Sequence, residues 1–132
     1  MASFVGETNA LPGRVVQAVN GEATVDTSLG RFRARNPRHL AEGAQAVLFV
    51  RPEALHPGLA AENSCEAEAV ELAYEGSLTH AGFRGADGTR LLALLGAAAR
   101  QALPAQGARV RLGFTTEDAV VLPTGRPDHA LS

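Results

Sequence analysis

The chain has 132 residues, enough for one domain that buries roughly two-thirds of its unfolded surface without disulfides or a metal. All 12 basic residues are arginine, and residues 1–66 and 67–132 each carry six against seven acids, so no basic face for nucleic acid is expected. The single cysteine, Cys65, excludes an internal disulfide and suits a reducing cytosol, and neither a secretory leader nor the ~18 apolar residues of a membrane-spanning helix are found.

Strand signals dominate the chain. Asn20-Gly21 supplies the two positive φ angles of a type I′ turn and predicts a tight hairpin. In residues 31–35 arginine alternates strictly with Phe32 and Ala34, which predicts a strand with one buried and one charged face. The predicted strands are 14–19, 22–27, 31–35, 45–51, 66–74, 77–84, 109–114 and 119–122, of which 45–51 is apolar enough to be covered on both faces.

The arginines of 31–35 look at first like a nucleic-acid stripe on an OB-like sheet. The preceding strand carries acidic residues on one face, however, and places Asp26 opposite Arg33 for a turn at 29–30 or opposite Arg31 for a turn at 28–29. Such cross-strand pairs neutralise the stripe. With a single aromatic residue for base stacking, a solvated, charge-paired face is expected instead.

Residues 90–103 allow two interpretations. Their leucines and alanines are strong helix formers. The hairpin turn Asp87-Gly88 directly precedes them, however, and favours a strand at 91–95, which leaves 97–102 for a helical turn.

A weak internal repeat predicts two related halves. GAQAVLFVRPEAL from Gly43 and GARVRLGFTTEDA from Gly107 align at an offset of 64, and each leaves its strand through a glutamate, Glu53 or Glu117. We therefore expect an all-β domain of two coupled, partly open barrels that pair their edge strands. The expected division is an N-terminal linker (1–12), a barrel domain (13–123, with halves of about 13–55 and 66–123) and a mobile tail (124–132).

Three short motifs resemble those of one family. FVGETN (Phe4 to Asn9) is similar to a Phe-Ile-Gly-x-x-Asn element, Arg51-Pro52-Glu53 matches an Arg-Pro-Glu motif, and Tyr74-Glu75-Gly76 resembles a Tyr-x-Gly element. All three belong to the TOBE domain, a small OB-like β-barrel at the C-terminus of importer-type ABC transporter ATPase subunits. The resemblance covers about residues 4–123 and is nearest to the polyamine and ferric-iron branch.

The resemblance implies a non-catalytic regulatory and dimerisation domain of an ABC importer of the polyamine, iron or sugar class. Its partners would be the upstream ATPase domain of the same chain, a second ATPase subunit and, indirectly, membrane permease subunits, in the cytoplasm at the inner face of the membrane. A phosphate loop of the form GxxxxGK[ST] needs a lysine, and the chain has none. No cofactor is therefore expected here, ATP and Mg²⁺ being bound upstream, and the solute is read by other subunits.

The residues expected to form interfaces or corners are Phe4, Gly6, Asn9, Arg51, Pro52, Glu53, Tyr74, Glu75 and Gly76. Pro52 should end its strand and fix the exit direction, while Arg51 and Glu53 form either a structural corner or a salt bridge across an interface. Asn9 is expected to cap or bridge backbone groups. The N-terminal element as a whole is either an anchored linker or a transmitter of motion.

Two other function classes stay open. An oxyanion or small-ligand module would use amides and hydroxyls of Gly76-Ser77 and Thr115-Thr116, and a nucleic-acid OB module would use the sheet face. A catalytic or metal site is not expected, because the four histidines lack HxH or HxxxH spacing, Cys65 has no CxxC partner and no serine sits in a nucleophile elbow. The oligomeric state of the isolated domain is left open.

Overall fold

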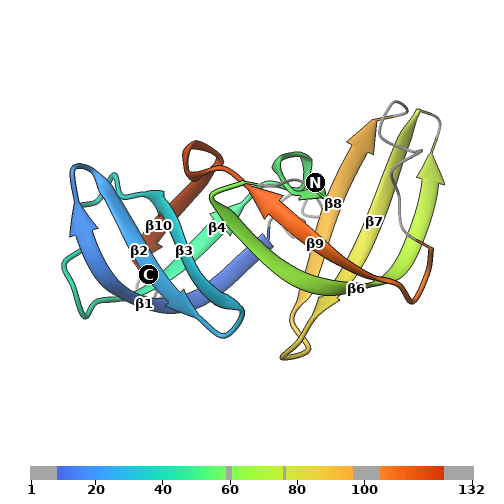
Figure 1. Ribbon diagram of the computed structural model, residues 1–132. Coiled ribbons are helices and arrows are strands. Elements are labelled where there is room, and N and C mark those ends of the chain that lie inside the picture. Colours follow the sequence, from blue (N-terminus) through green and yellow to red (C-terminus); the bar gives the residue numbers. More distant parts are fainter. Residues whose placement is uncertain (1–8, 59–60, 76, 97–104, 124–132) are drawn as a thin grey trace, which may run out of the picture.

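A computed structural model describes residues 9–58, 61–75, 77–96 and 105–123. The predicted residues Phe4, Gly6 and Gly76, the helical turn at 97–102 and the tail 124–132 lie outside these ranges. Within them, no helix is long and apolar enough to cross a membrane. The elements are β1 (Asn9–Val19), β2 (Glu22–Thr27), β3 (Gly30–Arg35), β4 (Gln45–Val50), the 3-10 turn η1 (Pro52–Ala54), β5 (His56–Pro57), β6 (Asn63–Glu75), β7 (Leu78–Gly85), β8 (Arg90–Gly96), β9 (Arg109–Phe114), the 3-10 turn η3 (Thr116–Asp118) and β10 (Ala119–Pro123) (Figure 1).

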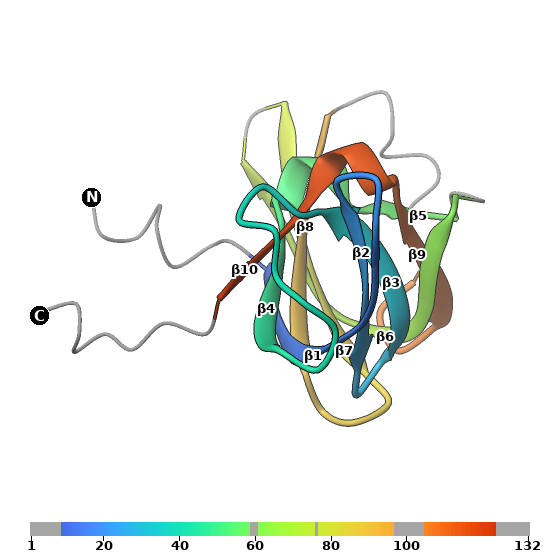
Figure 2. The same ribbon diagram turned by 90° about the vertical axis from the view of Figure 1, so that its left-hand side faces the viewer.

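The strands form two sheets, which confirms the all-β prediction. β1-β2-β3-β10-β4 closes into a barrel, and β5-β9-β6-β7-β8 forms a five-stranded sheet. The barrel and the sheet lie side by side in Figure 1. Figure 2 looks at the molecule from the side of the barrel.

The two halves exchange their last strands. β4 runs into η1 and β9 runs into η3, as the repeat at offset 64 implies. After these turns β5 pairs with β9 (His56 opposite Gly113), and β10 pairs with β4 (Val120 opposite Phe49). The sheets therefore do not follow the expected halves 13–55 and 66–123, because each short strand closes an edge of the other half instead of its own.

The long first strands of the two halves also correspond. β1 starts opposite Val50 at Asn9, and β6 starts opposite Phe114 at Asn63. Both strands are bulged at related positions, between Val15 and Gln17 in β1 and between Ala69 and Glu71 in β6. Since β1 already begins at Asn9, the last four residues of the expected linker 1–12 belong to the barrel.

Local turn chemistry decides the hairpin registers. Asn20 and Gly21 have φ angles of 54° and 78° and join β1 to β2, as predicted.

Strand β4 is covered less completely than expected. It buries Ala46, Leu48 and Val50, whereas Val47 and Phe49 are only half-buried.

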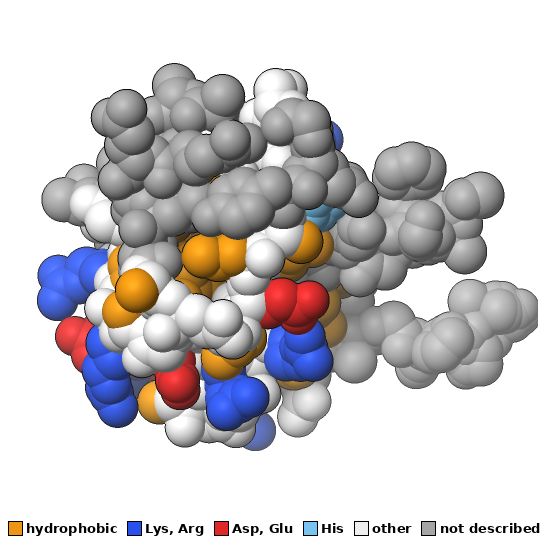
Figure 3. Space-filling view, turned by 90° about the vertical axis from the view of Figure 1, so that its right-hand side faces the viewer, with side chains coloured by type: hydrophobic (Ala, Val, Ile, Leu, Met, Phe, Trp, Pro, Cys, Tyr) orange, Lys and Arg blue, Asp and Glu red, His pale blue; other side chains and the backbone are white. Residues whose placement is uncertain are grey.

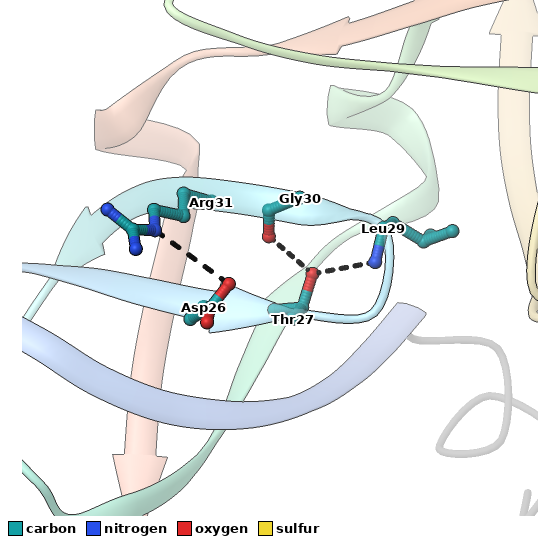
Figure 4. A network of polar contacts seen from close by, with 5 residues as sticks. All are labelled: Asp26, Thr27, Leu29, Gly30 and Arg31. Carbon is teal, nitrogen blue, oxygen red and sulfur yellow. Dashed lines mark hydrogen bonds and ion pairs between the residues drawn. The ribbon is translucent and has the colours of Figure 1, made fainter.

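The β2–β3 hairpin turns at Ser28-Leu29, the second of the two registers considered. Asp26 lies opposite Arg31, with 3.8 Å between its Oδ1 and the arginine Nε. Figure 4 shows how Thr27 closes the turn: its hydroxyl donates to the Gly30 carbonyl (2.7 Å) and accepts from the Leu29 amide (3.1 Å). The charge-paired outer face is thus present at this pair.

Residues 90–96 form strand β8 and not a helix. Leu91, Ala93 and Leu95 are buried, while Leu92 and Leu94 face outward, the period of two that one covered face requires. Pairing with β7 across the Asp87-Gly88 turn overrides the helix propensity of these residues.

The cores of the two halves meet at an aromatic contact. The rings of Phe32 in β3 and Phe114 in β9 have centroids 5.3 Å apart at 54°, and both are buried. Tilted aromatic pairs stabilise the folded state by more than the burial of their apolar area alone would do. The halves therefore share one hydrophobic core.

We expect Gly13→Ala to destabilise the barrel, because a Cβ there would lie 2.5 Å from the Asp26 carbonyl oxygen and 2.8 Å from Val25 Cγ1. Urea unfolding should show a loss of about 1–3 kcal/mol as β1 moves away from β2. The matched control is Gly96→Ala, where no atom lies within 4 Å of the added Cβ. Its stability should stay the same or rise by up to about 1 kcal/mol. Equal effects of the two variants would contradict the close approach at Gly13.

Candidate functional site

Asn9 connects the barrel to the second sheet. Its side chain is buried at the start of β1, with 5% of the residue exposed. The carboxamide nitrogen donates to the Leu92 carbonyl (2.8 Å), and the Leu92 amide donates to the carboxamide oxygen (2.7 Å). Asn9 therefore bridges both backbone groups of one residue in β8.

Asn63 makes the reciprocal connection from the second sheet to the barrel. The Arg33 amide donates to its Oδ1 (2.8 Å), and its Nδ2 donates to the Arg33 carbonyl (3.0 Å). It is 2% exposed and begins β6, 54 residues after Asn9. Asn63 falls between the two halves expected from the sequence, about 13–55 and 66–123. Both long strands, β1 and β6, begin with an asparagine, and this correspondence is the signal for the role of Asn63. It is hidden in the sequence because β1 and β6 are 54 residues apart, whereas the repeat that contains β4 and β9 has an offset of 64.

The Arg51-Pro52-Glu53 segment forms a corner next to β8. β4 ends at Val50 as the proline predicts, and Pro52 opens η1, in which the Ala54 amide donates to the Arg51 carbonyl (3.0 Å). η1 lies against β8. The side chains of Arg51 and Glu53 are exposed and form no ion pair with another described residue. What the structure describes here is a corner with two charges available to solvent.

The Tyr74-Glu75-Gly76 element lies where β6 turns toward β7. Tyr74 is opposite Thr79 and Glu75 opposite Leu78. Gly76 and the side chains of Tyr74 and Glu75 lie outside the described part of the chain. Of the predicted site residues, Asn9 and the η1 corner are thus brought together on β8.

The hairpin tips of the two halves also contact each other. The Ser28 hydroxyl donates to an Asp87 carboxylate oxygen, and that side chain accepts further hydrogen bonds from the Thr89 amide (2.9 Å) and hydroxyl (2.7 Å). These donors, Ser28 first and then Thr89, lower the pKa of Asp87 to about 2. Leu29 packs so closely on Gly85 that a Cβ there would lie 2.5 Å from Leu29 Cδ2.

No three His, Cys, Asp or Glu side chains in the described ranges are placed to hold a metal ion. Burial, and then the charge of Asp87, raises the pKa of the Cys65 thiol, which disfavours the reactive thiolate. What the arrangement provides is coupling between two halves.

Sequence comparison identifies the family. The family model for the TOBE domain matches residues 48–122. The chain belongs to the TOBE-domain family. The spermidine/putrescine import ATP-binding protein PotA of Rubrobacter xylanophilus is 41% identical to this TOBE chain over 97 residues, in its C-terminal region. The match covers 70% of this chain and 26% of PotA, so the TOBE chain spans about a quarter of that relative.

Structural comparison confirms the OB-type barrel fold. A molybdate-bound crystal structure of the cytoplasmic molybdate-binding protein ModG superposes on the TOBE chain with a TM-score of 0.77. The match covers 88% of this chain and 96% of the ModG chain at 18% identity, a level at which the likeness concerns the fold.

Asn63→Ala should destabilise the TOBE chain, because the amide and carbonyl of Arg33 lose both hydrogen bonds at a part-buried site. We expect a loss of about 1–3 kcal/mol in urea unfolding. Asn20→Gly is the control, since Asn20 sits at an exposed hairpin tip with a φ of 54° that glycine adopts freely. If Asn63→Ala unfolds at the same urea concentration as the control, the bridge contributes nothing to the stability of the domain.

The Asp87 contact predicts a specific dependence of stability on pH. Its pKa is lowered from 3.8 to about 2, so its contribution is complete above pH 4 and is lost as the pH falls through 2. Asp87→Asn should be less stable at neutral pH, and its stability should fall less between pH 4 and 2. Chemical denaturation at a series of pH values measures this. Parallel curves for the two proteins would refute the assignment.

Proposed function

We propose that this TOBE chain is the non-catalytic, C-terminal regulatory and dimerisation domain of the ATP-binding subunit of an ABC importer of the polyamine class. The observation that carries the proposal is the 41% identity with the C-terminal region of a spermidine/putrescine import ATP-binding protein, of which the chain spans 26%. In such a subunit the ATP-binding part would occupy the remaining three quarters.

The proposed partners follow from this assignment. They are the ATPase domain upstream in the same polypeptide, a second ATP-binding subunit and, through these, the permease subunits at the cytoplasmic face of the membrane. ATP and Mg²⁺ would be bound upstream, and this chain would take part in assembly and regulation without a cofactor of its own.

The structure suits a domain that receives motion at its N-terminus. Asn9 is the first described residue of β1, and it is hydrogen-bonded to β8 of the other sheet. Asn63 returns the connection from β6 to β3. A displacement of the preceding chain would therefore move barrel and sheet as one body.

The likeness to ModG favours oxyanion binding as a second candidate, since ModG is a molybdate-binding protein. Two donors of one segment considered for such a site are already engaged. The Thr116 amide donates to Glu62 Oε1 (2.8 Å) and the Thr115 hydroxyl to Asp118 Oδ2 (3.0 Å). The Thr116 hydrogen bonds lower the pKa of Glu62, so the Thr116 amide already holds a carboxylate.

A chimeric subunit tests the first proposal. The matching C-terminal region of the Rubrobacter protein is replaced by this chain, and dimerisation by light scattering and ATP hydrolysis are compared with the intact subunit and with a truncated subunit. We expect the chimera to retain most of the dimerisation and activity that truncation removes. A chimera no better than the truncated subunit would refute the role.

Calorimetry of the 132-residue chain separates the two candidates. Titration with molybdate, sulfate and spermidine should give no binding heat if the chain acts through its neighbours alone. Saturable heat with molybdate would favour the oxyanion module.

A further inference from the structure

The outer face of β6, β7 and β8 carries an apolar patch around His80, with the charged residues Glu71, Arg84 and Arg90 on the same face. Five residues of the patch point outward and are called the apolar face: Ala73, Leu78, Gly82, Leu92 and Leu94. Leu78 is 42% exposed, whereas Leu92 and Leu94 are half-buried and lie outside the hydrophobic core. Figure 3 views the molecule from the side of the second sheet and shows hydrophobic side chains gathered beside a histidine and oppositely charged groups.

The barrel shows that the fold does not require leucine at these positions. The two asparagine bridges identify Arg33 in β3 as the counterpart of Leu92 in β8. Two residues further along, Arg35 corresponds to Leu94, and both arginines are exposed. At these two positions the face is charged in one half and apolar in the other. An apolar patch that the fold does not need marks a surface that another molecule or domain covers.

The N-terminus of the described chain lies at this face. Asn9 is hydrogen-bonded to both backbone groups of Leu92, so the described chain begins beside the apolar face. The eight residues before Asn9 span at most about 29 Å when extended. A domain attached through them is held near the face at an effective concentration in the millimolar range.

The size of the face favours a tethered partner over a second copy. Three strands about 4.8 Å apart and seven residues long make a surface of roughly 300 Å². A stable free-standing interface needs about 800 Å² from each partner. A tethered partner needs less area, because the linker lowers the entropic cost of association.

The rim of the face carries both signs of charge. Arg90 and Glu71 form an exposed pair, with 3.8 Å between guanidinium nitrogen and carboxylate oxygen. A partner that fits presents a small apolar patch flanked by one acidic and one basic side chain.

We propose that the apolar face is the docking surface for the ATP-binding domain that precedes this chain in the same polypeptide. The inference rests on the proposed function and names the face through which the two domains contact. Because Asn9 joins the same strand to the barrel, docking there fixes the orientation of both halves.

Hydroxyl-radical footprinting tests the inference on the isolated chain and on the chimera. The reactivities of Leu78, Leu92 and Leu94 should be several-fold lower in the chimera. The control is Val19, 50% exposed on the outer face of the barrel, whose reactivity should be the same in both proteins. Equal leucine reactivity in the two proteins overturns the inference. So does protection in the isolated chain that rises with concentration, which would assign the face to a second copy.

A double variant, Leu92→Arg with Leu94→Arg, gives the face the residues the barrel already has. The isolated variant should unfold at the midpoint of the parent chain, and Leu78 in the variant chimera should regain the reactivity of the isolated chain. Val19→Arg is the matched control and should leave Leu78 protected. Unchanged protection of Leu78 in the double variant overturns the inference. A chimera that dimerises and hydrolyses ATP with reactive leucines refutes this inference alone, whereas an inactive chimera with protected leucines refutes the proposed function alone.

Discussion

Two buried asparagines hold this domain together. Asn9 and Asn63 each begin a long strand, and each gives its carboxamide to both backbone groups of a residue in the other sheet. A carboxamide suits this position because it carries one donor and one acceptor in a plane, as a neighbouring strand does. The exchange of β5 and β10 and the contact of Phe32 with Phe114 cross the same boundary. The domain is therefore a pair of halves that cannot separate without leaving buried backbone groups unpaired.

The internal repeat lets one half act as a reference for the other. Where the halves agree, as in the bulges of β1 and β6 and the turns after β4 and β9, the feature belongs to the fold. Where they differ, as between the arginines of β3 and the leucines of β8, the fold accepts either, and the difference points to the surroundings of each half. A single exposed leucine is normal at a protein surface, whereas the leucines of the apolar face stand where the other half carries arginine.

The asparagine bridges between the two halves and the apolar face suit a domain that acts by contacting other domains. Near η3, the Thr116 amide and the Thr115 hydroxyl, two groups that could bind a small ligand, are engaged by Glu62 and Asp118. The groups that face outward next to the N-terminus include the leucines of the apolar face and the charged pair of Arg90 and Glu71. A domain coupled in this way transmits a displacement of the chain attached at Asn9 to both of its sheets.

The sequence by itself determined the local structure and the family. Asn20-Gly21, the alternation of 31–35, the proline stop at Pro52 and the turn before β8 each depend on neighbours in the chain, so they could be predicted. Tertiary structure alone decided that β10 returns to the barrel, that the turn at Ser28-Leu29 meets Asp87 and that Asn63 bridges to β3. These contacts join residues 30 or more positions apart. No local pattern encodes such a pairing, because only the packed sheets determine which backbone groups need a partner.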